Sequence, residues 1–84
     1  MLSMVRLKNI RMNDRTVEAD YFPESGTASG HIVVDLSSEE IISVTDADGY
    51  EPPYGASYKG HAFWALLEMA RTGDTSTERL VMWY

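Results

Sequence analysis

The side chains best suited to chemistry lie in the segment 50–58, which we call the tyrosine loop, and in the few positions that follow it. Tyr50, Tyr54 and Tyr58 recur every four residues, but two prolines and a glycine between them argue against a continuous helix. Phenol hydroxyls donate hydrogen bonds, and the imidazole of His61 exchanges a proton near neutral pH. We therefore weigh two interpretations. One is a small-molecule-binding or enzymatic pocket, with His61 as acid or base and Tyr54 or Tyr58 donating hydrogen bonds. The other is a cap of aromatic rings over the core, with the hydroxyls at water.

A second group of candidate residues follows on the polar strip of the expected helix. His61, Trp64 and Glu68 have the spacing i, i+3, i+7. His61 and Glu68 are two turns apart, about 10 Å along the axis, which is too far for a direct acid–base dyad. Asp48 or Glu51 of the loop could orient His61 instead. A tryptophan on the polar side of a helix indicates either an interface anchor or a ring covered by the loop.

Several kinds of site are excluded by residue type and spacing. The chain has no cysteine, which removes disulfides, thiolate nucleophiles and cysteine-based zinc sites. His31 and Asp35 share a strand face but lie about 13 Å apart, so they form no catalytic pair. Residues 46–49 do not match a calcium-binding EF-hand loop. If Gly49 is aligned with the conserved glycine of such a loop, Val44 falls at the first ligand position and Gly55 falls where the bidentate glutamate ligand should be. We assign no catalytic residue, no metal and no cofactor.

The charge of the chain is unevenly distributed. The net charge is −6; residues 1–15 carry four basic side chains and one acid, whereas residues 16–58 carry nine carboxylates and no lysine or arginine. We expect the basic strand to neutralise an acidic neighbour, and we expect no nucleic acid as partner. A third functional interpretation takes the acidic segment as a mimic of nucleic-acid charge that inhibits a DNA-binding protein. The absence of cysteine, of a signal-peptide core and of a membrane span predicts a soluble, cytoplasmic protein.

Period-2 alternation predicts several half-buried strands. Residues 16–22 and 28–36 alternate cleanly between apolar and polar side chains. In residues 5–12 the apolar parity shifts, which predicts a bulge near Lys8 and Asn9 or two short strands.

Residues 37–49 carry two conflicting signals. Ser37 with Glu40 matches the capping box of a helix start, whereas the β-branched residues from 41 to 45 suit a strand. We favour a hairpin, because the segment is short for a helix and its acidic residues then fall in the turn.

The C-terminal third predicts a helix followed by a strand. From Tyr58 to Thr72 the apolar residues form an arc wider than the roughly 100° stripe that seats a helix on a sheet, and Gly73 supplies the stop. The last strand, in residues 77–84, places Leu80, Met82 and Tyr84 on one side and Arg79, Val81 and Trp83 on the other.

These elements predict one domain, residues 1–84, of the α+β class. We expect a two-layer sandwich with the element order β-β-β-β-α-β, in which one helix packs on one face of a mostly antiparallel five-stranded sheet. The expected strand order is fifth, first, second, third, fourth. The alternative pairs the fifth strand parallel to the fourth.

The segments GHIVVDL, EEII, GHA before an apolar helix, and the ending VMWY occur in that order. With them the chain, from about Val17 to Tyr84, resembles a family of small cytosolic proteins of Gram-positive bacteria. The resemblance implies a bacterial, cytoplasmic origin and supports the hairpin in residues 37–49. It implies no activity and no catalytic residue.

The leading functional hypothesis is a small protein-interaction module. The wide apolar arc of the helix, the two-faced last strand and the terminal Trp83 and Tyr84 predict more exposed apolar surface than a monomer of this size usually leaves uncovered. We therefore expect a homodimer that associates through the helix flank and the last strand, with an unidentified protein as the other possible partner. The proposed binding residues are Tyr50, Tyr54, Tyr58, His61, Trp64, Glu68, Trp83 and Tyr84.

Overall fold

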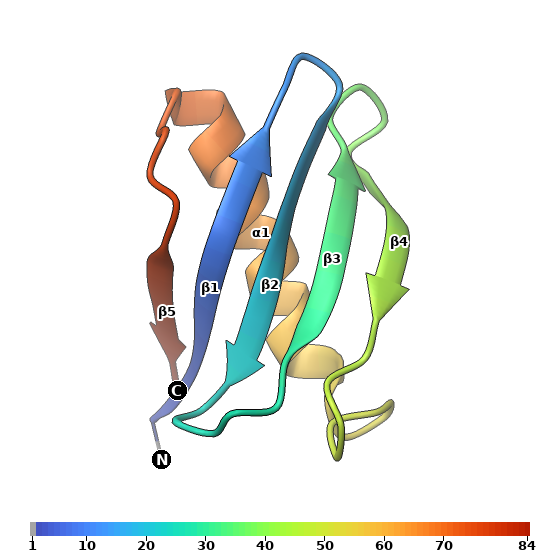
Figure 1. The fold of residues 1–84 in the computed structure, drawn as a ribbon, viewed down its shortest axis with the longest axis vertical. Helices are drawn as coiled ribbons and strands as arrows, with labels where there is room; N and C mark the ends of the chain where they lie inside the picture. Colours follow the sequence, from blue (N-terminus) through green and yellow to red (C-terminus); the bar gives the residue numbers. More distant parts are fainter. Residues whose placement is uncertain (1) are drawn as a thin grey trace.

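The computed structural model describes residues 2–84 and contains one sheet and one helix (Figure 1). The elements are β1 (Ser3–Met12), β2 (Thr16–Pro23), β3 (Gly30–Asp35), β4 (Glu40–Thr45), α1 (Ala56–Thr72) and β5 (Arg79–Trp83). The sheet order is β4-β3-β2-β1-β5, and each neighbouring pair is antiparallel. The predicted α+β fold and strand order are confirmed, and β5 does not pair with β4.

The sheet has one face covered by α1 and one open face. On β2 and β3 every second residue is buried, as the sequence alternation predicts. The helix packs against β1, β2, β3 and β5 and closes the core between the two layers. The fully or nearly buried side chains of this core include Val5, Leu7, Val17, Ala19, Tyr21, Ile32, Val34, Ala62, Leu66 and Met69.

The predicted irregularity in β1 is a β-bulge. The pairing of β1 with β2 shifts between Lys8 and Arg11, and Asn9 has a φ of 54°, in the left-handed region that asparagine tolerates better than most residues. The bulge returns Ile10 to the buried face after Leu7. It also turns the Asn9 side chain toward the open face, where its amide donates to Asp20 Oδ2 at 2.8 Å.

The segment of residues 37–49 forms a hairpin strand, as favoured from the sequence. The Asp35 carboxylate accepts hydrogen bonds from the backbone N–H of Ser38 and from the hydroxyls of Ser37 and Ser38, so it fixes the turn that leads into β4. All residues of β4 are exposed, because this strand lies at the sheet margin and α1 covers its neighbours instead.

The helix starts two residues before the predicted Tyr58 and stops where predicted. Gly73 adopts a φ of 73°, and its N–H and that of Asp74 both bond to the Met69 carbonyl, which closes the last turn. The helix α1 within residues 2–84 is neither long nor apolar enough to cross a bilayer.

Candidate functional site

The tyrosine loop ends in a continuous row of aromatic rings that joins the loop, α1 and β5. Tyr54 stacks on Tyr50 with ring centroids 5.4 Å apart, and Tyr50 meets the edge of Tyr58 at 5.2 Å. Tyr58 in turn contacts Trp83 at 5.6 Å, and the His61 ring stacks on Trp83 at 3.9 Å. We call these five residues the aromatic row. The structure thus brings together five of the eight residues proposed from the sequence.

Tyr58 is the best-fixed member of the aromatic row. Its hydroxyl donates to Glu24 Oε2 at 2.7 Å, and the same oxygen accepts the backbone N–H of Met4 at 3.3 Å. Burial, together with this carboxylate, raises the pKa of Tyr58 to about 12. The hydroxyl therefore keeps its proton and ties the start of α1 to the end of β2.

His61 lies on the aromatic row without an orienting group. Within residues 2–84 its ring forms no hydrogen bond to a carboxylate, and its stacked contact with Trp83 covers one ring face. Asp48 and Glu51, the loop carboxylates considered from the sequence, both lie exposed. This placement gives His61 a packing role, and the pocket hypothesis under the tyrosine loop stays an untested prediction.

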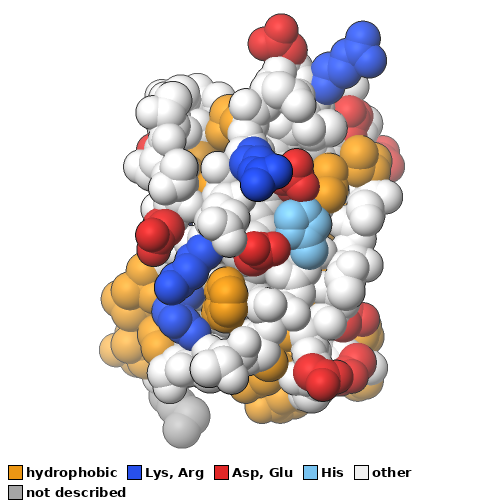
Figure 2. Space-filling view, viewed as in Figure 1, with side chains coloured by type: hydrophobic (Ala, Val, Ile, Leu, Met, Phe, Trp, Pro, Cys, Tyr) orange, Lys and Arg blue, Asp and Glu red, His pale blue; other side chains and the backbone are white. Residues whose placement is uncertain are grey.

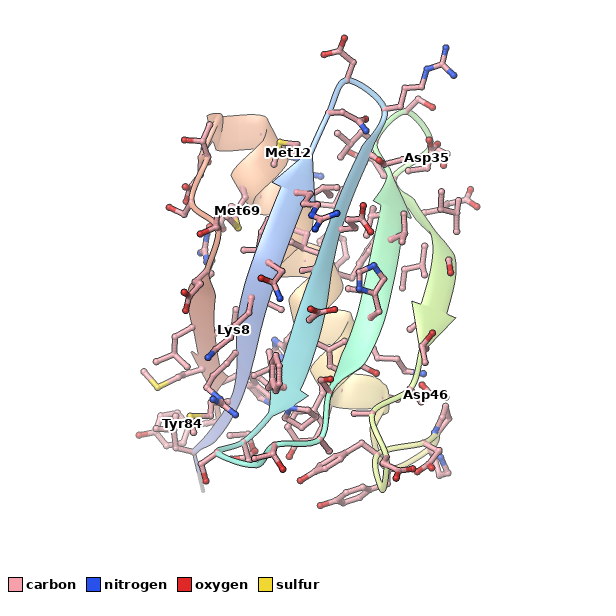
Figure 3. The ribbon with its side chains drawn as sticks, viewed as in Figure 1. Lys8, Met12, Asp35, Asp46, Met69 and Tyr84 are labelled. Carbon is pink, nitrogen blue, oxygen red and sulfur yellow. The ribbon has the colours of Figure 1, made fainter. Side chains whose placement is uncertain are left out.

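The remaining three proposed residues lie outside the aromatic row. Glu68 accepts from Arg79 Nη2 at 2.8 Å, so it links the helix to β5. Trp64 is 60% exposed, and the one aromatic ring that it meets within residues 2–84 is Phe63, at 5.2 Å between ring centroids. Tyr84 projects almost fully exposed beyond the end of β5 (Figure 3). Trp64 and Tyr84 are thus available to a partner.

A polar cluster on the open face was missed from the sequence. His31 Nδ1 lies 2.8 Å from Asp20 Oδ1, and His31 Nε2 lies 2.7 Å from Glu18 Oε2. From the sequence, His31 was considered as a partner of Asp35 on its own strand only. The pairing register of β2 with β3 would have predicted the cluster, because Asp20 lies opposite His31 and Glu18 lies two residues from Asp20 on the same face.

The electrostatics of this cluster favour a charged imidazolium. Hydrogen bonds to Asp20 and then to Glu18 raise the pKa of His31, although partial burial opposes this. The pKa of Asp20 is lowered, first by the Asn9 amide and then by His31. Both ring nitrogens lie within hydrogen-bond distance of carboxylates, so the protonated His31 ring donates a hydrogen bond to each. No group of ligands in residues 2–84 could hold a metal ion.

This cluster makes stability depend on pH near neutrality. Because the folded pKa of His31 lies above the unfolded value of 6.5, its contribution is fully present below pH 6.5 and is lost as pH rises through the folded pKa. All three side chains are a third or more exposed, so we expect at most about 1 kcal/mol. Urea unfolding at pH 5.5 and pH 8.5 should show wild type losing more free energy of unfolding than His31→Gln. Equal losses in both proteins would contradict this assignment.

No protein-family model, curated protein or solved structure matches this chain. The resemblance to small Gram-positive cytosolic proteins accordingly stays a prediction.

The exposed apolar side chains concentrate at the two margins of the sheet. On β4 they are Ile41, Ile42 and Val44, and on β5 they are Leu80 and Met82. Figure 2 shows hydrophobic side chains gathered at the lower left, over the β5 margin and beside Lys and Arg side chains. An open hollow of about 400 Å³ adjoins this margin and is lined by Arg6, Leu7, Lys8, Glu78, Arg79 and Leu80. Both sheet margins are therefore candidate contact surfaces.

Proposed function

We propose that this protein is a small interaction module that self-associates through β5 and the adjoining flank of α1. One observation carries the proposal: β5 pairs only with β1, so its outer edge meets no strand within residues 2–84, and it displays Leu80 and Met82 at 53% and 55% exposure. An unpaired apolar strand edge is a template for pairing with another strand. A cytoplasmic location, predicted from the cysteine-free sequence, is part of this proposal.

The other margin of the sheet is less suited to a second copy. The register between β3 and β4 shifts between Val33 and Val34, and such a bulge interrupts the regular edge that a new strand needs. If two β4 strands paired antiparallel about Ser43, Glu40 of one copy would lie opposite Asp46 of the other, and these like charges would oppose pairing. Lys59 offsets the charge of Asp46 only. β5 contains neither a bulge nor a carboxylate.

The helix flank continues the surface of β5 on the other layer. His61 lies over Trp83, and Glu68 bonds to Arg79, so the helix face that carries these two residues turns toward β5. Trp64 lies between them on the same strip and is mostly exposed. Tryptophan in the middle of a contact surface is a common binding hot spot. A partner strand at the β5 edge would meet this helix strip as well.

Light scattering on a dilution series tests the proposal. We expect wild type to be dimeric at tens of micromolar. Met82→Glu should weaken association about tenfold or more, because each copy would hold a carboxylate against apolar side chains of the partner strand. The matched control is Ile42→Glu, which places the same charge on the equally exposed residue at the β4 margin, at 59% exposure, and should leave the dimer unchanged.

Three results would overturn the proposal. In the first, wild type stays monomeric at these concentrations. In the second, Ile42→Glu dissociates the dimer and Met82→Glu does not. In the third, wild type forms an open polymer in which β5 of one copy pairs with β4 of the next. The first removes self-association, and the other two assign it to a different surface. Far-UV circular dichroism of both variants checks that they remain folded.

A further inference from the structure

We propose that two copies pair β5 with β5, antiparallel, about a twofold axis that passes at Val81. This rests on the proposed function and specifies its geometry. Because the axis stands perpendicular to the sheet, the two five-stranded sheets would join into one continuous sheet with both helices on the same face.

The symmetry of an edge-paired dimer limits the possible registers. Directly opposite residues of antiparallel strands point to the same face of the sheet. A twofold axis perpendicular to the sheet leaves every side chain on its own face, so each residue can pair only with a residue of the same face. The axis must therefore pass where one residue lies opposite its own copy. A centre at Val81 pairs all five residues of β5, from Arg79 to Trp83. A centre at Leu80 or Met82 pairs only about three of the five within the strand. The register at Val81 therefore forms the longest ladder.

The side chains that meet in this register are complementary on the open face. Leu80 of each copy lies opposite Met82 of the other, which covers two of the most exposed apolar side chains of the sheet. Two residues further out on the same face, Glu78 lies opposite Tyr84, whose hydroxyl can donate to the carboxylate. No like charges face each other on this side.

The pairs on the helix face are complementary too. Val81 meets its own copy, and Arg79 lies beside Trp83 of the second copy, where a guanidinium can contact the indole ring. Within each copy Glu68 holds Arg79, and His61 stacks on Trp83. The twofold axis thus places the Glu68 end of one helix strip on the same side as the His61 end of the other.

Disulfide trapping tests the register directly, because the natural chain has no cysteine. Leu80→Cys and Met82→Cys are mixed in equal amounts in a glutathione redox buffer, and the disulfide-linked species are identified by intact mass. Opposite residues have Cα atoms about 4.5–5.5 Å apart, within disulfide reach, whereas Leu80 and its own copy are diagonal neighbours beyond about 7 Å. We expect the mixed 80–82 species to exceed either homodimeric species at least about tenfold. Ile42→Cys is the control for random collision and should give little disulfide.

The outcomes separate the register from self-association. Wild type that is dimeric by light scattering, while 80–80 or 82–82 linkage predominates, overturns the register and leaves self-association intact. The same holds if a dimeric protein gives no linkage above the Ile42→Cys control, since the contact then lies elsewhere. A monomeric wild type overturns both proposals.

Discussion

Gly30→Ala should unfold much of the protein at temperatures at which wild type is folded. Gly30 is buried at the start of β3, opposite Tyr21, and a methyl group there would overlap the Tyr21 ring and the backbone carbonyl of Thr45. The carbonyl cannot move without breaking the β3–β4 pairing at that end. The tyrosine hydroxyl is also held, because it accepts the N–H of Ala47 at 3.3 Å. The methyl group therefore has no space to enter.

We expect Gly30→Ala to cost about 3 kcal/mol or more, at the upper end of overpacking effects. A domain of this size has a total stability of about 4–12 kcal/mol, so the melting temperature should fall by more than about 10 °C. The control is Gly60→Ala in the interior of α1, where a methyl group meets nothing within 4 Å. It should raise stability by about 0.5–1 kcal/mol, because alanine favours the helix. Thermal unfolding by circular dichroism at one fixed protein concentration measures both. If Gly30→Ala left the melting temperature unchanged, this would contradict the tight packing of Tyr21 against this backbone.

The architecture was predictable because it follows from local patterns. The alternation in residues 16–22 and 28–36 decides which side chains face the helix, and a shift in that alternation reveals the bulge at Asn9. Gly73 marks the helix end through a backbone conformation that glycine readily adopts.

The contacts that build the candidate site were not predictable in the same way, because they join residues far apart in the chain. His31 finds its two carboxylates on the neighbouring strand, and only the strand register decides which residues face each other. The helix spacing of His61, Trp64 and Glu68 shows that they share a strip. It does not show that two of them contact β5 while Trp64 is left exposed. Such pairings depend on how layers pack, which residue spacing alone does not encode.

Tyr58→Ala should be the most damaging substitution in the tyrosine loop. Tyr58 is only 8% exposed, contacts both Tyr50 and Trp83, and donates to Glu24. Its removal leaves a cavity at the junction of α1 and β5 and takes the donor from a partly buried carboxylate. By comparison with other aromatic truncations we expect a loss of about 3–5 kcal/mol in the free energy of unfolding.

Tyr54→Ala is the matched control, because Tyr54 stacks on Tyr50 at the other end of the same aromatic row but is 66% exposed. It should cost about 1 kcal/mol or less, since little apolar area is lost to water. Tyr58→Phe keeps the ring and removes only the hydroxyl, and should fall between the two. Denaturant unfolding of the three variants gives the order directly. If Tyr58→Ala were no more destabilising than Tyr54→Ala, the aromatic row would not hold the loop to the core, and a binding role for these tyrosines would become the better explanation. The expected order instead makes the loop a structural cap, which leaves the β5 margin as the surface on which function depends.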